Sequence, residues 1–576
     1  MFQITHPTAA AARLIENLLI KRKKVHNIIG KTSLFLTAKV VASTVFPIFI
    51  TLELLLKRIP KCAIALASCK KNKEKLENQL SKVASFALGL VLSIPLGIMH
   101  DSDSVSSLFL KRRTKPNEIR PFGVENEYGT VLKENILYPK NHEEVSQAIA
   151  KARNEKKTIS IIGAGMSQGT QTIPDENGLV IHTKHLNSIA FNDDGTVTAG
   201  SGASWEDILV EANKRGQSLG VKQASDIFSI GGSIGINCHG WAHQLGSLSR
   251  SSTIESVDVI DASGKLSTLK KDDPLFKCVF GTLGYFGVVV SAKIRLPRNE
   301  QLKEHSHTFP VEKFFEGYNP LKTREDVPLF GGRLNLDSIK RNPLSEVVMV
   351  QYDRQPSETG PVVTPDFQRE SKYGHRIQRI GLNLFSHLTD FSAKLMLASF
   401  WKGEKKQMDK GRTITRNEAI HPELKAFMKL HASNLHTQWL QEYFVTEKEL
   451  APFLQFLGAT LKKNKVRLTN ATIRPTPKDE FSILPYAEQD RYAIVICFKQ
   501  TKTVKAIAKT RKWINEVTEE LLKRNGRFYQ AYMPFATKEQ FERSYGKETL
   551  ERLRELKKQY DPDGIFCSKH TKKYYT

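Results

Sequence analysis

Hydrophobic residues follow one pattern in the first fifth of the chain and another after about residue 124. In the first part they gather in two long runs, at 34–56 and 83–99. Beyond it, short apolar runs rich in β-branched residues alternate with segments in which apolar positions recur every three or four residues. The short runs predict strands and the spaced segments predict helices, so the main part of the chain is expected to mix α and β structure.

The expected elements form two groups. In the first, strands are expected at 131–139, 158–163, 178–183, 196–199, 256–260 and 288–296, and helices at 141–154 and 204–215. Asn141 stands at the N-cap of its helix, with Glu144 placed to complete a capping box. In the second group, strands are expected at 346–352, 466–473 and 492–498, and helices at 422–436, 447–464, 502–525 and from 538 onward. The polar segment 101–121 is expected to be a linker.

The first 115 residues carry 19 basic and 6 acidic side chains, half of the net charge of +26. Their apolar runs are flanked by basic clusters such as 21–24 and 111–113. This arrangement fits a bilayer with anionic headgroups better than nucleic acid, so residues 1–115 are expected to be helical and membrane-associated. Neither run is an ideal spanning helix of roughly 20 apolar residues, and a helical hairpin, an interfacial anchor or packing on the main domain are alternatives.

Composition narrows the class of protein. An apolar content of 40% excludes a wholly disordered chain. The six cysteines are too scattered for a disulfide framework and lack a His or Cys cluster for zinc, so no metal site is expected. The main domain is therefore expected in a reducing compartment such as the cytoplasm.

Two glycine-rich turns carry candidate chemistry. The first, 163–169, follows an expected strand directly, and the second is 230–235. Glycine lets main-chain N–H groups come close to an anion, so the two turns together could hold a diphosphate. The first turn departs from the spacing G-x-G-x-x-G and no suitably placed acidic residue follows it, which argues against a nicotinamide-binding Rossmann domain.

The stretch 225–240, S-D-I-F-S-I-G-G-S-I-G-I-N-C-H-G, is more specific. With the first turn and G-T-L-G-Y-F-G-V-V at 281–289, it resembles the FAD-binding domain of the vanillyl-alcohol oxidase or p-cresol methylhydroxylase (PCMH) type. Segments at 441–445, 468–474 and 526–566 look like decaprenylphosphoryl-β-D-ribose oxidase-like and sugar-lactone or alditol oxidase-like members of this FAD-linked oxidase family, the group that includes D-arabinono-1,4-lactone oxidase-like proteins. The resemblance covers 124–298 closely and the chain to residue 576 more loosely.

The resemblance implies an α+β fold. A two-subdomain PCMH-type FAD-binding domain is expected at 124–298, an α/β substrate or cap domain at 299–525, and a C-terminal segment at 526–576 that returns to the flavin site, all preceded by the apolar helical region 1–115. It further implies that FAD is bound by Gly163, Ala164, Gly165, Met166, Ser167, Gln168, Ser225, Gly231, Gly232, Ile236, His239, Gly240, Gly284, Gly287 and Val288.

Two positions depart from the family pattern. Many members link FAD covalently through a histidine where this chain has Met166, so the FAD is expected to be non-covalent. The ribose oxidase has a catalytic lysine where this chain has Tyr532, which leaves the substrate and the base open. A tyrosine there can donate a hydrogen bond, or act as a base if its pKa is lowered.

The resemblance implies that His239 lies at the flavin ring, where an imidazole suits acid–base work, although it could also only fill and brace its turn. Tyr532 and Tyr529 are the other catalytic candidates, and Glu442, Thr472 and Arg474 are candidates for binding substrate. Surface salt bridges would explain Glu442 and Arg474 equally well.

The expected function is a flavoprotein oxidoreductase, an oxidase or dehydrogenase that oxidises an alcohol carbon of a sugar-like, lactone, polyol or lipid-linked sugar substrate by hydride transfer to flavin N5. Oxygen or a quinone would then accept the electrons. Two alternatives remain open: an FAD-dependent reductase of a lipid or sterol double bond, and a non-catalytic membrane-associated binding protein that keeps the fold.

Overall fold

The computed structural model describes residues 118–119, 131–175, 177–336, 342–356, 361–365, 367, 411–421 and 436–576. The expected N-terminal helical region therefore lies outside the described residues, as does the expected helix at 422–436 apart from its last residue, which starts a strand. A short pair of strands, β1 (Glu118–Ile119) and β2 (Val131–Leu132), precedes the main body.

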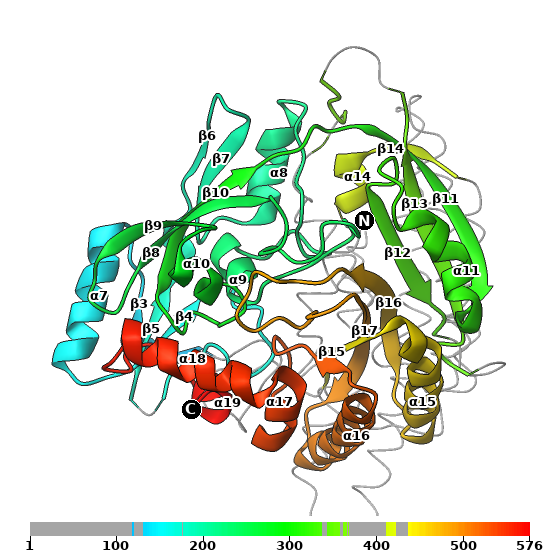
Figure 1. The fold of residues 1–576 in the computed structure, drawn as a ribbon. Helices are drawn as coiled ribbons and strands as arrows, with labels where there is room; N and C mark the ends of the chain where they lie inside the picture. The colour runs from blue at the N-terminus through cyan, green and yellow to red at the C-terminus, as the bar shows by residue number, and fades with distance from the viewer. Residues whose placement is uncertain are drawn as a thin grey trace, which may run out of the picture.

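Three larger sheets carry the main body (Figure 1). The first is parallel, in the order β3 (Ile136–Leu137), β5 (Leu179–His182) and β4 (Ile159–Ile162), with α7 (His142–Asn154) beside it. The second is antiparallel, in the order β6 (Ile189–Phe191), β7 (Thr196–Gly200), β10 (Val288–Arg295), β8 (Ile254–Ile260) and β9 (Leu266–Lys270). Helices α8 (Trp205–Asn213), α9 (Ile230–Gly235) and α10 (Pro274–Val279) belong to this part.

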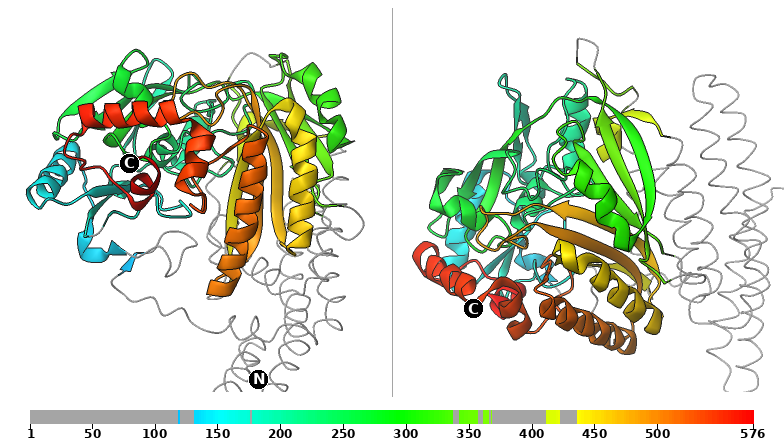
Figure 2. Two further views of the ribbon diagram at one scale, coloured as in Figure 1. Left: turned by 60° about the horizontal axis from the view of Figure 1, so that its bottom comes forward. Right: turned by 45° about the vertical axis from the view of Figure 1, so that its right-hand side comes forward.

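The third sheet has eight antiparallel strands, in the order β14 (Thr413–Thr415), β11 (Gln301–Pro310), β13 (Glu346–Arg354), β12 (Leu329–Leu334), β16 (Leu468–Thr476), β17 (Arg491–Thr501), β15 (His436–Val445) and β18 (Arg527–Phe528). Its helices are α11 (Phe314–Tyr318), α14 (Arg416–Ile420), α15 (Leu450–Lys463) and α16 (Val504–Lys523). Figure 2 shows α15 and α16 side by side on one face of this sheet, and buried residues of both helices share one core with the sheet.

Short 3₁₀ helices connect several elements: Lys133–Asn135, Thr183–His185, Val311–Lys313, Asn319–Leu321 and Glu447–Glu449. The chain ends in α17 (Lys538–Tyr545), α18 (Lys547–Tyr560) and α19 (Lys569–Tyr574). Among the described residues, no helix combines the length and the apolar character that crossing a bilayer requires.

Local sequence signals explain most helix starts. The side chain of Asn141 caps α7 by accepting from the Glu144 N–H, as expected, but the Glu144 carboxylate accepts from the Lys140 N–H instead of closing a box on Asn141. The expected glycine turn at 230–235 is in fact the short helix α9. Ser229 caps it, and a Cβ on Gly231 would lie 2.8 Å from the Cβ of Ser201, so the glycine lets this helix pack close to its neighbour.

The C-terminal segment returns to the first sheet. The Ile159 N–H donates to the Ile565 carbonyl over 2.7 Å, and the Cys567 N–H donates to the Ile159 carbonyl over 2.9 Å. The segment therefore lies alongside β4, whose strand runs directly into the first glycine turn. In Figure 1 the three last helices lie along the bottom of the view, between α16 and the small parallel sheet.

A buried ion pair holds this return in place. Lys557 donates to Asp561 over 2.6 Å and to the carbonyls of Tyr285 and Phe566 over 2.6 and 2.7 Å. The Asp561 side chain is fully buried. A buried carboxylate without its cation is costly, so Lys557 stabilises the joint between the chain end and the domain that precedes it.

Replacing Lys557 with Met should lower the free energy of unfolding by about 3 kcal/mol, because Asp561 would keep its charge without a buried partner. A thermal unfolding scan should show a melting temperature lower by several degrees. The matched control is Lys558→Met, since Lys558 is exposed. Equal melting temperatures for the two variants would contradict this role of the ion pair.

Candidate cofactor and active site

Three glycine motifs meet at one place in the fold; the first motif is the turn 163–169, the second is 225–240 and the third is 281–289. The first turn lies against the start of α9, because the Ala164 N–H donates to the Ser229 hydroxyl over 3.0 Å. A Cβ on Gly163 would lie 2.2 Å from that same hydroxyl oxygen, which explains the glycine. Segments far apart in the sequence thus bring glycine-rich main chain together, as a diphosphate cradle requires.

The third motif joins the other two. The Gly281 and Leu283 N–H groups donate to the carbonyls of Ile234 and Gly235 over 3.1 and 2.9 Å. Gly284 has a φ of 77°, and a Cβ there would lie 2.5 Å from Ile161 on β4. A side chain at this position would therefore push the third motif away from the strand that precedes the first turn.

Unpartnered polar atoms accompany these turns. The Ser225 and Ser201 hydroxyls and the Gln223 amide nitrogen are buried without a hydrogen-bond partner among the described residues. Buried polar groups are normally satisfied. A dinucleotide rich in phosphate and hydroxyl oxygens would supply the missing partners, so the donor set fits FAD.

The remaining residues expected to bind the cofactor differ in their burial and in the contacts of their side chains. Met166 and Ser167 are half-buried in the first turn. The Gln168 side chain is directed elsewhere: it donates to the Gln438 carbonyl over 3.0 Å and accepts from the Leu440 N–H over 2.8 Å. This amide ties the first turn to β15 and is not free for a phosphate. Val288 is fully buried in the core under the first sheet.

His239 is buried where the second motif meets the eight-stranded sheet. Its Nε2 lies 2.5 Å from Oε1 of Glu442, and its Nδ1 has no partner among the described residues. The rings of Phe444, Tyr486 and Tyr529 surround the imidazole, with centroids 5.7, 5.6 and 6.1 Å away. The aromatic wall fixes the ring and leaves one nitrogen available.

Glu442 links three of the expected residues. Its Oε1 contacts His239 and its Oε2 accepts from the Tyr532 hydroxyl over 3.1 Å. Burial acts to raise the pKa of Glu442, but the positive charge that His239 carries when protonated and its hydrogen bond, helped by Arg474 and Tyr532, lower this pKa below its usual value. The carboxylate is therefore ionised at neutral pH, and its burial excludes the alternative of a surface salt bridge for this residue.

The two tyrosines differ in what they can do. Burial, followed by the charge of Glu442, raises the pKa of Tyr532 well above its usual value, so this hydroxyl is a hydrogen-bond donor and not a base near neutrality. Burial, followed by Tyr486 and Glu442, raises the pKa of Tyr529 in the same direction. The Tyr529 hydroxyl donates to the Ile236 carbonyl over 2.7 Å, so its proton holds the second motif.

Thr472 and Arg474 lie on β16, two strands away from Glu442. Register places Thr472 opposite Val495 on β17, and Val495 opposite Glu442 on β15, so the three side chains share one face of the sheet. The Thr472 hydroxyl and the Arg474 Nε are buried without a partner among the described residues. The structure thus brings together His239, Glu442, Tyr532, Thr472 and Arg474.

A buried carboxylate that the sequence did not reveal braces this site. Asp479 accepts from the side chains of Asn237, Ser247, Ser249 and Ser482 over 2.8–2.9 Å. Asn237 has a φ of 50°, an uncommon conformation that these contacts support. Asp479 therefore fixes the segment immediately before His239 against the loop that follows β16. Nothing in its local sequence sets it apart from a surface aspartate.

A second buried cluster lies beside the same segment. Lys222 donates to Asp226 over 2.6 Å, and His421 Nδ1 lies 2.5 Å from the other Asp226 oxygen. Burial acts to raise the pKa of Asp226, but Lys222 and His421 lower it. The sequence flagged none of the three, because they are brought together only by the fold. A Cβ on Gly240 would lie 2.0 Å from the Lys222 carbonyl oxygen, so the cluster packs directly against the end of the second motif.

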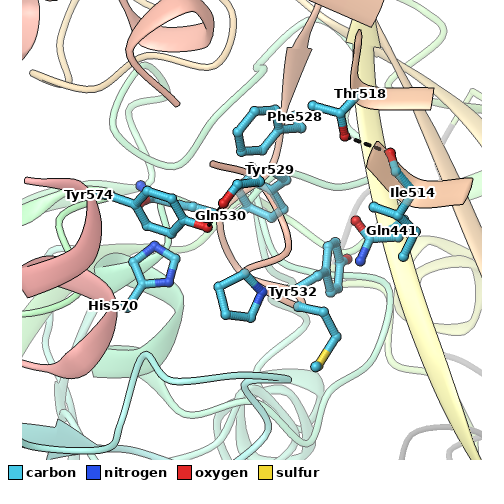
Figure 3. A pocket seen from close by; sticks show the side chains of 12 residues that line it. Gln441, Ile514, Thr518, Phe528, Tyr529, Gln530, Tyr532, His570 and Tyr574 are labelled. Atoms are coloured by element: carbon cyan, nitrogen blue, oxygen red, sulfur yellow. Dashed lines mark hydrogen bonds between the residues drawn. The ribbon is translucent and has the colours of Figure 1, made fainter. Parts of the chain in front are cut away.

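A small cavity lies behind Tyr532, on the helix side of the eight-stranded sheet (Figure 3). Gln441, the neighbour of Glu442, and His570 of α19 line it, and neither the Gln441 amide nitrogen nor the two His570 ring nitrogens have a partner among the described residues. Burial, followed by the charge of Lys573, lowers the pKa of His570 to about 3, so this imidazole is neutral. The cavity lies on the opposite side of β15 from Glu442.

Comparisons with known proteins agree with this geometry. A family model for an FAD binding domain matches residues 134–270, which contain the first two glycine motifs. A model for D-arabinono-1,4-lactone oxidase matches residues 344–574, which contain Glu442, Thr472, Arg474 and Tyr532. The cofactor of the domain is therefore FAD.

The chain is also similar to curated oxidases. L-gulonolactone oxidase of Bos taurus is 22% identical over 77% of this chain and 95% of its own length. D-arabinono-1,4-lactone oxidase of Candida glabrata is 25% identical over 33% of this chain and 37% of its own length. Decaprenylphosphoryl-beta-D-ribose oxidase of Mycolicibacterium smegmatis is 27% identical over 29% of this chain and 37% of its own length. Against several other curated relatives, the chain spans only 33% to 44% of their length.

Replacing Gly240 with Ala should lower the FAD content of the purified protein severalfold, because the new Cβ would collide with the Lys222 main chain and displace the second motif. The ratio of visible flavin absorbance to protein absorbance measures this content. Gly235→Ala is the matched control, since a Cβ there would meet only Leu283, at 3.8 Å. Equal flavin content in both variants would contradict the proposed cradle.

Proposed function

We propose that this chain, which belongs to the FAD-linked oxidase family, is an FAD-dependent oxidoreductase that oxidises the CH–OH carbon of a small, hydroxyl-rich substrate. The family match supports the class of reaction. The observation that carries the substrate class is an ionised, buried Glu442 that shares its site with three buried polar atoms lacking partners among the described residues: His239 Nδ1, Thr472 Oγ1 and Arg474 Nε.

Those atoms suit a neutral polyhydroxy ligand. Each substrate hydroxyl is both a donor and an acceptor, so it can satisfy a carboxylate oxygen and a guanidinium N–H at once. Sugar-like substrates, lactones, polyols and lipid-linked sugars all present such hydroxyls. The first candidates are the compounds that appear in the names of the relatives: L-gulonolactone, D-arabinono-1,4-lactone and decaprenylphosphoryl ribose.

Bound FAD supplies the acceptor for the hydride that leaves the substrate carbon. The substrate hydroxyl must lose its proton at the same time. A neutral His239 that donates from Nε2 to the ionised Glu442 keeps Nδ1 as its basic nitrogen, and the proposed reaction starts from this form. We assign the hydroxyl proton to this Nδ1, with Glu442 stabilising the imidazolium that results.

Tyr532 takes a supporting part in this proposal. Its hydroxyl donates to Glu442 Oε2 and so holds the carboxylate toward His239. It stands where the ribose oxidase has a lysine, and the raised pKa makes it a donor without a positive charge.

Met166 replaces the histidine that binds FAD covalently elsewhere in the family, so the FAD is proposed to be non-covalent. Oxygen or a quinone would reoxidise it, and association with a membrane would favour a quinone or a lipid-linked substrate.

The test is an anaerobic screen of the purified flavoprotein with lactones, polyols and isoprenyl-phosphate sugars. Loss of the visible flavin band on mixing identifies a substrate. Bleaching by an alcohol in any of these groups supports the proposal. A protein that holds FAD but is bleached by none of them, and whose chemically reduced form is reoxidised by an unsaturated lipid, would be a double-bond reductase instead.

With a substrate in hand, Glu442→Gln should slow anaerobic flavin reduction by about 10²- to 10⁴-fold, since the imidazolium loses its counter-charge. The lowered pKa of Glu442 keeps its charge present above that pKa, so the loss should persist across the whole neutral range and disappear only in acid, where wild-type Glu442 also becomes protonated.

Tyr532→Phe is the matched comparison at the other end of the same hydrogen bond. It should slow reduction by no more than about tenfold and leave the shape of the pH profile unchanged up to pH 10, because the pKa of Tyr532 lies well above 10. If Tyr532→Phe cost as much as Glu442→Gln and removed an alkaline limb of the profile, Tyr532 would be the base and the assignment to His239 would fail.

A further inference from the structure

Basic residues gather at one edge of the eight-stranded sheet, where β17 ends and α16 begins. The segments 459–470 and 499–512 contain ten basic residues and no acidic one. Contacts hold them together: the Lys509 ammonium donates to the Asn464 carbonyl and the Lys499 N–H to the Arg467 carbonyl, both over 2.9 Å. We call the six exposed lysines of these segments the basic edge; they are Lys462, Lys463, Lys465, Lys505, Lys509 and Lys512.

The charge of the basic edge is barely compensated. Lys463 has one exposed partner, Glu516, at 3.3 Å. Within the part of the chain that the structure describes, Lys465, Lys505 and Lys512 form no ion pair. The N-terminus of the 20-residue helix α16 adds the positive end of its dipole to the same place. A surface of one charge sign attracts a partner of the opposite sign.

An exposed apolar residue lies within one of the two basic segments. Val504, the first residue of α16, is 84% exposed, and the other large hydrophobic residues exposed in the described part, Leu266 and Val363, are 44% and 47% exposed. Lys505 is exposed beside it. An exposed apolar residue next to exposed lysines matches the boundary between lipid headgroups and acyl chains.

The described surface favours lipid over nucleic acid. Single strands are bound through aromatic side chains on which bases stack, and no aromatic residue is among the large hydrophobics exposed in the described part. The sequence of residues 1–115 independently combines apolar runs with basic clusters. We propose that the basic edge docks on an anionic lipid surface, with Val504 entering the headgroup layer.

This docking surface is separate from the active site. Helices α15 and α16 cover one face of the eight-stranded sheet, whereas Glu442 and Thr472 lie on the other face. Neutralising the basic edge should therefore leave flavin content and anaerobic flavin reduction unchanged. The proposal can fail while the proposed reaction stands, and the reverse is also true.

The experiment compares two charge-matched variants of the full-length, FAD-loaded protein. The first carries Lys465→Gln, Lys505→Gln and Lys512→Gln. The control carries Lys156→Gln, Lys277→Gln and Lys558→Gln, which remove the same charge from exposed positions elsewhere. Binding is measured by co-sedimentation with vesicles of phosphatidylcholine alone and with added phosphatidylglycerol, and melting temperatures confirm that both variants fold.

We expect the first variant to bind the anionic vesicles at least tenfold more weakly than wild type and the control to bind as wild type does. Adding Val504→Ser to the first variant should weaken its binding further. Hydrogen exchange in 499–512 should slow when anionic vesicles are added to wild type. Equal binding by both triple variants, whether unchanged or equally weakened, would overturn the proposal. So would loss of oligonucleotide binding in the first variant with vesicle binding unaltered.

Discussion

The contact between His239 and Glu442 is the interaction on which the site depends. It joins side chains 203 positions apart, one at the end of the second glycine motif and the other on β15. Both are almost fully buried. Burying a carboxylate costs free energy unless the group is paired and hydrogen-bonded. Here the imidazole, the Tyr532 hydroxyl and the charge of Arg474 all stabilise the carboxylate of Glu442. This pair therefore joins the cofactor-binding part to the eight-stranded sheet at the reaction site.

Other buried polar contacts hold the same two parts in register. Gln168 bonds to the main chain of β15 from the first turn, Asp479 binds the segment before His239, and Lys557 ties the chain end to the third motif. Each crosses between segments distant in the sequence. Within the described residues, the Thr472 hydroxyl and the Arg474 Nε are among the buried side-chain atoms without a hydrogen-bond partner, although most buried polar atoms in proteins are paired. Because Thr472 lies on the same face of the sheet as Glu442, these atoms mark that face as the place where the polar groups of a ligand would fit.

The buried charges of this protein act in the proposed chemistry, whereas its exposed charges affect which surfaces it binds. The active site is built around a buried negative group, whereas most of the excess positive charge lies in residues 1–115 and on the basic edge. Buried charges set the protonation of neighbouring groups, and exposed charges of one sign set which surfaces the protein approaches. The two roles can therefore be altered independently.

Sequence by itself determined the strands and helices whose apolar spacing is strong, such as β4, β10 and α16, together with the helix start at Asn141 and the glycine motifs. These elements and motifs depend on residues only a few positions apart in the sequence, so a local sequence pattern is enough to predict them. Only the tertiary structure decided that 230–235 is a helix, that Gln168 faces β15, and that Asp479 and the Lys222–Asp226 pair are buried. Such outcomes depend on strand register and on contacts between segments hundreds of residues apart, which no local pattern records.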